Sequence, residues 1–222
     1  GEHRYPSVEW LLELDRLAHD VQPGEIKLSM HLCGSVVRGI LTGELPNSVW
    51  AFSSMFDRYQ LNFHAEKNVC DPIKALMSLL CLGEMGKRQI IFQIDGELGN
   101  THLENIRNVA YTSVDLVGLF DISGGAGILP ESWPCPIYKD VRGNYESHGY
   151  AGGLGPDNLT EQLTLVGAAA GDCPIWVDME TKVRSDDDSM LSLAKVRRCL
   201  EIAAPLVKRD VLAPSWDPKE YE

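Results

Sequence analysis

Residues 114–127 of the 222-residue chain read VDLVGLFDISGGAG, and this stretch indicates the fold. Residues 114–120 form a largely apolar run, which suits a strand that is buried on both faces of a parallel sheet. Asp121 follows the strand directly, and a glycine-rich turn at 124–127 follows Asp121. Because the working residues of parallel α/β proteins lie at the carboxyl ends of strands, we expect this turn to border a functional site.

Strand-like and helix-like segments alternate almost from end to end, which is typical of parallel α/β architecture. Six strands suit a doubly wound open sheet, whereas a closed (β/α)8 barrel needs eight, so spacing alone leaves both folds open. No break in composition divides the chain, and we predict a single domain over residues 1–222. The predicted strands are 26–32, 59–64, 89–94, 114–120, a segment ending near 151, and 175–178. The predicted helices are one from residue 8 that is stopped by Pro23-Gly24, and 36–41, 71–83, 101–110, 158–169 and 189–204, with a long loop at 123–147.

Composition and charge exclude several classes of protein. The net charge of −12 argues against nucleic-acid binding, but it leaves open an anion bound by backbone N–H groups. No apolar run approaches the roughly 20 residues of a membrane-spanning helix. None of the six cysteines forms a C-x-x-C pair, so we expect no zinc knuckle and free thiols in a reducing cytosol. The sequence therefore predicts a cytoplasmic protein without a metal or cofactor, and it leaves self-association open.

Polar residues and glycines gather where the predicted strands end. Asp121 and its glycines can transfer a proton beside a bound ligand, or they can simply cap a tight turn. The paired glycines at 152–153 run into a predicted helix, which favours a bound phosphate, although an ordinary βα turn has the same pattern. The strand-end residues are His31, Cys33, Gly34, Asn62, His64, Glu66, Asp95, Asp121, Gly152, Gly153, Asp178, Glu180 and Lys182.

Two of these segments resemble phosphoribosylanthranilate isomerase. That family has a strand-end acid, a G-G-T-G-like turn and a tryptophan, and Asp121, residues 124–127 and Trp133 stand in the same order. Its A-G-G-L-x-P-x-N segment matches residues 151–158 without a gap. More loosely, residues 60–66, residues 177–184 and Arg4-Tyr5 are similar to its Q-L-H-G-x-E strand, its V-D-V-S-S-G-V-E segment and its S-P-R-Y. The resemblance extends from Arg4 to about Ala204.

The resemblance implies a (β/α)8-type (TIM) barrel whose first strand and most of whose second lie before residue 1. It also implies an Amadori rearrangement of a phosphoribosyl substrate, as in tryptophan biosynthesis. Asp121 would be the acid that opens the ribose ring, because it matches the family's strand-end aspartate. By the same resemblance, the substrate would contact Arg4, His64 and Gly125, and the phosphate would contact Gly152, Gly153 and Thr181. Lys182 stands where the family has a glycine, and its ammonium group is a further candidate contact to the phosphate.

The family's catalytic base is a cysteine in a K-I-C-G segment, which has no counterpart in this chain. Cys33 follows a predicted strand close to His31 and is the candidate replacement, with an inert thiol as the alternative. Two other functions stay open at this point. One is a non-catalytic barrel that binds phosphate ligands or serves as a scaffold. The other is a different barrel enzyme that uses His31, Cys33, His64 and Asp121.

Overall fold

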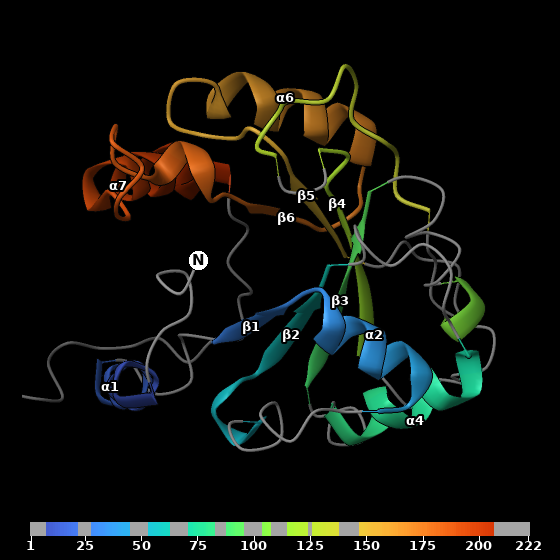
Figure 1. Ribbon diagram of the computed structural model, residues 1–222. Helices are drawn as coiled ribbons and strands as arrows, with labels where there is room; N and C mark the ends of the chain where they lie inside the picture. Colours follow the sequence, from blue (N-terminus) through green and yellow to red (C-terminus); the bar gives the residue numbers. More distant parts are fainter. Residues whose placement is uncertain are drawn as a thin grey trace, which may run out of the picture.

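In the computed structural model, residues 8–21, 28–44, 53–62, 71–82, 88–95, 104–107, 115–123, 126–137 and 147–206 are described. Six strands form one sheet in the order β1-β2-β3-β4-β5-β6, and each strand pairs in parallel with the next (Figure 1). This confirms the predicted parallel α/β architecture. The strands are β1 (Ser29–Leu32), β2 (Arg58–Leu61), β3 (Gln89–Ile94), β4 (Asp115–Phe120), β5 (His148–Ala151) and β6 (Ile175–Asp178).

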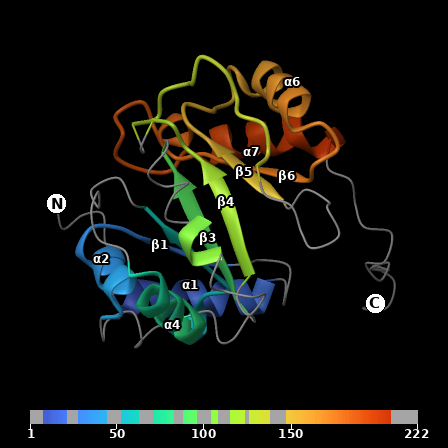
Figure 2. The same cartoon turned by 90° about the vertical axis from the view of Figure 1, so that its right-hand side faces the viewer.

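Four of the helices form two pairs beside this sheet. Helices α2 and α4 pack against each other at one end of the molecule, and α6 packs against α7 at the other (Figures 1 and 2). Among the described residues, no helix is long and apolar enough to cross a membrane. The helices are α1 (Val8–Val21), α2 (Ser35–Thr42), α4 (Pro72–Leu82), α6 (Leu159–Ala170) and α7 (Leu193–Ala203), with the short 3-10 helices η2 (Ser53–Met55), η3 (Thr181–Val183) and η4 (Ala204–Leu206).

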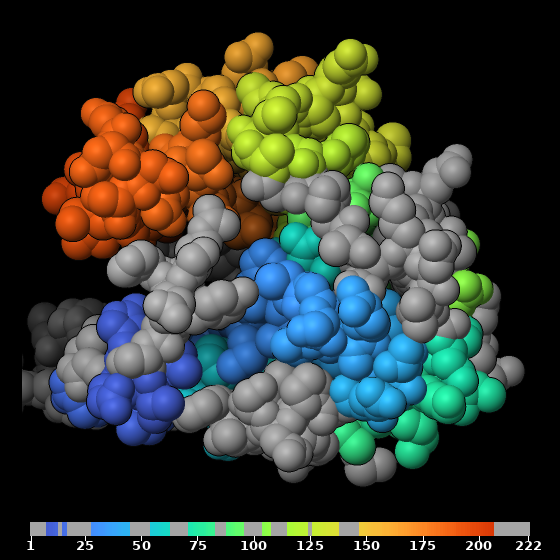
Figure 3. Space-filling view, in the orientation of Figure 1, coloured from blue at the N-terminus to red at the C-terminus, as the bar shows by residue number. Residues whose placement is uncertain are grey.

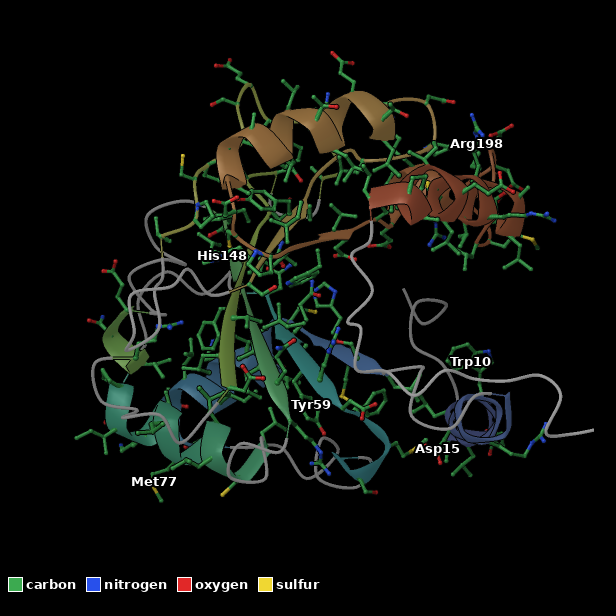
Figure 4. The ribbon with its side chains drawn as sticks, turned by 180° about the vertical axis from the view of Figure 1, so that it is seen from behind. Trp10, Asp15, Tyr59, Met77, His148 and Arg198 are labelled. Carbon is green, nitrogen blue, oxygen red and sulfur yellow. The ribbon has the colours of Figure 1, made fainter. Side chains whose placement is uncertain are left out.

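The main core lies between one face of the sheet and the helices α2 and α4. Successive strand residues point to opposite faces, so Tyr59 and Phe92 join this core while their neighbours face the other side. Fully burying one large apolar side chain contributes roughly 1.5–3 kcal/mol. Figure 4 shows Tyr59 and His148 within the sheet, whereas Met77 and Arg198 point outward from α4 and α7.

The opposite face of the sheet carries a smaller apolar cluster. Ile91, Val117, Leu119 and Ala151 are buried there, and the Trp176 side chain packs against them. An ideal Cβ on Gly149 would lie 2.4 Å from the Trp176 ring, so the glycine leaves room for the indole. Polar residues occupy the same face closer to the carboxyl ends of the strands, where the cavity described below opens.

The sheet curls strongly, so that β6 returns toward β1 and β2. Gln60 on β2 and His31 on β1 both lower the pKa of the Asp178 carboxyl group on β6, so the three side chains lie near one another. In a flat sheet, β2 and β6 would lie about 19 Å apart at the usual strand spacing. The six described strands therefore form a curled half-barrel with edges at β1 and β6, and closure into an eight-stranded barrel stays a prediction.

The sequence predicts a long loop between β4 and β5, and residues 126–137 of this segment indeed contain no helix. Trp133 anchors this loop, because its indole Nε1 donates to Gln162 Oε1 on α6 at 2.9 Å. The Tyr150 hydroxyl on β5 donates to the Pro134 carbonyl at 3.0 Å, and its ring meets Trp133 edge-on. The loop, coloured yellow-green, and the orange C-terminal segments make up the upper part of the surface in Figure 3.

One helix boundary was predicted wrongly. The last helix begins at Leu193, not at Ser189, because the preceding residues fold into a turn closed by a β-bridge between Arg184 and Leu191. Within that turn, the hydroxyls of Ser185 and Ser189 donate to Asp187. Side chains that bond the backbone locally compete with helix formation, which explains the late start of α7.

Candidate functional site

A cavity of about 340 Å³ opens at the carboxyl ends of the strands. Five of the six strands or their ends contribute polar side chains to it, because the curled sheet directs these residues inward. This is the place at which a parallel α/β fold collects its working residues. The polar side chains are Ser29, His31, Gln60, Gln93, Asp121, Ser123, Asp178, Glu180, Thr181 and Lys182, and the glycines are Gly127, Gly152 and Gly153.

Asp121 lies immediately after β4, is 6% exposed and lines the cavity. Its Oδ2 accepts a hydrogen bond from Gln93 Nε2 at 2.6 Å, and its Oδ1 accepts one from Ser123 Oγ at 2.6 Å. Ser123 Oγ in turn accepts the N–H of Gly127 at 3.2 Å, which orients its own proton toward Asp121. Both carboxylate oxygens of Asp121 therefore accept a hydrogen bond, and the donors are fixed by their own neighbours.

Gln93 is the penultimate residue of β3 and is 2% exposed. Its Nε2 is used by Asp121, whereas its Oε1 has no hydrogen-bond partner among the described residues. A buried acceptor of this kind is uncommon, because desolvation without a partner is unfavourable. Gln93 lines the cavity, while its Oε1 is itself buried.

Asp178 ends β6 and brings a second carboxylate to the cavity. Burial raises the pKa of Asp178 above its ordinary value of 3.8, with smaller raising contributions from Asp121 and Glu180. The imidazole of His31 and the side chain of Gln60 act in the opposite direction and lower this pKa. The net rise means that Asp178 holds a proton more readily than a carboxyl group in water.

The paired glycines after β5 form one wall of the cavity. Gly152 and Gly153 have φ values of +117° and +65°, a backbone region that favours glycine. An ideal Cβ on Gly153 would lie 2.7 Å from the Leu129 amide nitrogen, so the turn packs directly against the β4–β5 loop. Asn158 holds the far side of the turn, since its Nδ2 donates to the Gly153 carbonyl at 2.9 Å and its Oδ1 accepts the Gly155 N–H at 2.9 Å.

The loop after β6 closes the same wall. An ideal Cβ on Gly127 would lie 2.8 Å from Thr181 Oγ1, and one on Gly155 would lie 2.5 Å from Lys182 Cβ. The loops after β4, β5 and β6 are therefore in close contact around the cavity. This brings together the hydroxyl, the ammonium-bearing side chain and the glycine turn that the sequence assigns to a phosphate.

Eight of the residues that the sequence singles out line the cavity, namely His31, Asp121, Gly152, Gly153, Asp178, Glu180, Thr181 and Lys182. Cys33 follows β1, is exposed and is not among the residues that line the cavity. Arg4, His64 and Gly125 lie outside the described residues.

Sequence reasoning missed Gln93 and Gln60 and gave Asp178 no role. The signal for Gln93 was an amide in the otherwise apolar end of the segment QIIFQI, whose register partner Leu119 lies two residues before Asp121. Among the described residues, no three His, Cys, Asp or Glu side chains are grouped so that they could hold a metal ion. Comparison with known protein families and with curated proteins gives no match to this chain.

Proposed function

We propose that the chain isomerises a small sugar phosphate, in a reaction that resembles that of phosphoribosylanthranilate isomerase. The observation that carries the proposal is the presence of two carboxylates, Asp121 and Asp178, in one cavity with the turn at Gly152 and Gly153. An aldose–ketose isomerisation needs two proton-transfer groups and, for a phosphorylated substrate, an anion site. A cavity of about 340 Å³ lies in the size range of small-ligand sites.

The wall formed by the turn and the loop after β6 is the proposed phosphate site. Glycines let the backbone approach a ligand closely, and α6 begins shortly after the turn, at Leu159. Thr181 supplies a hydroxyl, and Lys182 supplies a cation from a residue that replaces the glycine of the resembled family. Local groups of this kind bind an anion despite the net charge of −12.

The two carboxylates supply the proton transfers. An acid protonates the ring oxygen as the C1–O bond breaks, and a base removes the proton from C2 to give an enol or enamine. This intermediate is then protonated at C1 and loses its hydroxyl proton to become the ketose. The resemblance makes Asp121 the acid. The hydrogen bonds donated to Asp121 and the raised pKa of Asp178 support the reverse arrangement, with Asp178 as donor and Asp121 as acceptor.

The proposal is tested by incubating the protein with ribose 5-phosphate and, separately, with an N-linked aminoribose 5-phosphate, and measuring ketose formation. Turnover of either compound supports an isomerase, and the preferred one identifies the substrate class. A second candidate function is a non-catalytic barrel that binds phosphate ligands. The two hydrogen bonds that Asp121 accepts favour it, because they also suit a carboxylate with a purely structural role. Binding of both compounds without turnover would favour that second function.

A further inference from the structure

Ser123 lines the cavity beside Asp121 and takes part in two hydrogen bonds. Its Oγ accepts the N–H of Gly127 at 3.2 Å and donates to Asp121 Oδ1 at 2.6 Å. Because the amide proton of Gly127 occupies one acceptor position of the hydroxyl, the hydroxyl proton is directed to the carboxylate. Hydrogen bonds from a hydroxyl to a charged oxygen are short and are among the stronger ones in proteins.

The Gly127 amide that orients Ser123 is itself held in place. Gly127 has a φ of +67°, and an ideal Cβ on it would lie 2.8 Å from Thr181 Oγ1. The turn is therefore packed directly against the loop after β6. Contact between these two loops sets the direction of the Gly127 N–H, and Ser123 connects this arrangement to Asp121.

Two donors are needed to fix the plane of the Asp121 carboxylate, because rotation about the Cβ–Cγ bond of an aspartate is only weakly restricted. Gln93 holds Oδ2 from β3, and Ser123 holds Oδ1 from the loop after β4. Without Ser123, the carboxylate would have one anchor among these two and could turn. A carboxylate oxygen has about two acceptor positions, so each oxygen keeps one for a proton from the substrate.

We propose that Ser123 is a positioning residue, which together with Gln93 holds the Asp121 carboxylate in the plane from which it removes the C2 proton of the substrate. Proton transfer from carbon requires aligned reacting atoms, so a carboxylate free to turn should react more slowly. Phosphate binding should change little, because its proposed contacts lie on another wall. This inference rests on the proposed function and adds to it a residue that acts through Asp121.

The test measures kcat and KM for ribose 5-phosphate or the N-linked aminoribose 5-phosphate, whichever the wild type converts. The variants are Ser123→Ala, which removes the hydroxyl, and Ser123→Thr, which keeps it. Ser185→Ala is the matched control, because Ser185 Oγ also donates to an aspartate two residues away, Asp187, but Ser185 is not among the residues that line this cavity.

Ser123→Ala should lower kcat by at least about tenfold, the scale of one hydrogen bond to a charged group, and should leave KM within about twofold. Ser123→Thr should recover most of the lost turnover, and Ser185→Ala should have the kcat of the wild type. Ser123→Cys is similar in size and only a weak donor, so it should show the loss even if Ser123→Ala does not fold.

Three results overturn the inference while the sugar-phosphate function stands. They are wild-type kcat in Ser123→Ala or Ser123→Cys, a Ser123→Thr enzyme as slow as these variants, and a change confined to KM. Turnover of neither compound by the wild type contradicts the proposed function itself, and the inference fails with it.

Discussion

Gln93 Nε2 lies 2.6 Å from Asp121 Oδ2, and this hydrogen bond links β3 to the end of β4 at the cavity. A similar pair stands at the opposite end of the same two strands, where Gln89 Nε2 donates to Asp115 Oδ2 at 3.2 Å. The first pair is buried and the second is exposed. Asp115 therefore serves as a control for Asp121, because it has the same kind of partner but lies outside the cavity.

Asp121→Asn should lower kcat for the isomerisation by at least ~10²-fold, because it removes a proton-transfer group while keeping the size of the side chain. Affinity for the sugar phosphate should change little, since the proposed phosphate contacts lie on another wall. Asp115→Asn should leave kcat unchanged. Steady-state kinetics of both variants measure this, and an Asp121→Asn enzyme with wild-type turnover would make Asp121 structural.

The raised pKa of Asp178 predicts how the stability of the protein depends on pH. Burial is the largest cause that raises the pKa of Asp178 in the folded protein, so the folded state keeps this proton at pH values where the unfolded chain has lost it. Stability should therefore fall as pH rises from about 4 through the folded-state pKa. Asp178→Asn removes this loss, so its Tm relative to wild type should increase between pH 4 and pH 7.

Asp187 provides a comparison of opposite sign. The Ser185 and Ser189 hydroxyls lower the pKa of Asp187 to about 2, so its contribution is present above the unfolded-state pKa and is lost as pH falls through 2. The Tm of Asp187→Asn relative to wild type should therefore decrease between pH 2 and pH 4. If both variants shift in the same direction, the assignment of these two environments is wrong.

Gly149→Ala should destabilise the protein by roughly 1–3 kcal/mol, the usual cost of overpacking, because the new methyl group would meet the Trp176 ring. Gly167→Ala is the matched control. Gly167 lies within α6, and nothing stands within 4 Å of its ideal Cβ, so alanine should stabilise the helix by about 0.5–1 kcal/mol. Urea unfolding of the two variants gives both values, and an equally stable Gly149→Ala protein would contradict the described packing of Trp176.

Gly153→Ala should weaken the binding of inorganic phosphate and lower stability. The new side chain would face a positive φ of +65° and would press on the Leu129 amide, which shifts the turn at the proposed phosphate site. Gly171 has a similar φ of +61°, but the space around its ideal Cβ is open. Gly171→Ala therefore loses stability only through the unfavourable backbone conformation and is the control. Titration with phosphate, followed by thermal shift, should show weaker binding for Gly153→Ala only. Equal phosphate affinity in both variants would remove the turn from the anion site.

The sequence predicts those parts of the fold whose signal is local. The strand at Gln89–Ile94 and that at Ile175–Asp178 were predicted at their observed bounds, because short apolar runs flanked by polar residues mark them. The last helix was misplaced because the hydroxyls of Ser185 and Ser189 hydrogen-bond Asp187 in a turn that helical periodicity does not reveal.

Only those parts of the site whose residues are adjacent in sequence were predictable. The turn at Gly152 and Gly153 is contiguous in sequence and lines the cavity as expected. The roles of Gln93 and Asp178 depend on partners from other strands, Asp121 and Gln60, which only the curled sheet brings near them. No pattern within a single segment indicates such contacts.

Exchange of the C2 proton with D2O tests the central claim most directly, because it reports proton removal in the cavity. It is measured on ribose 5-phosphate and, separately, on the N-linked aminoribose 5-phosphate. Proton NMR of the sugar in the presence of the wild-type protein should show loss of the C2–H signal well above the uncatalysed rate. Asp121→Asn should reduce this exchange by at least ~10²-fold, whereas Asp115→Asn should exchange like the wild type. A C2–H signal that persists in both sugars with the wild-type protein, or that disappears equally fast with Asp121→Asn, would contradict the account.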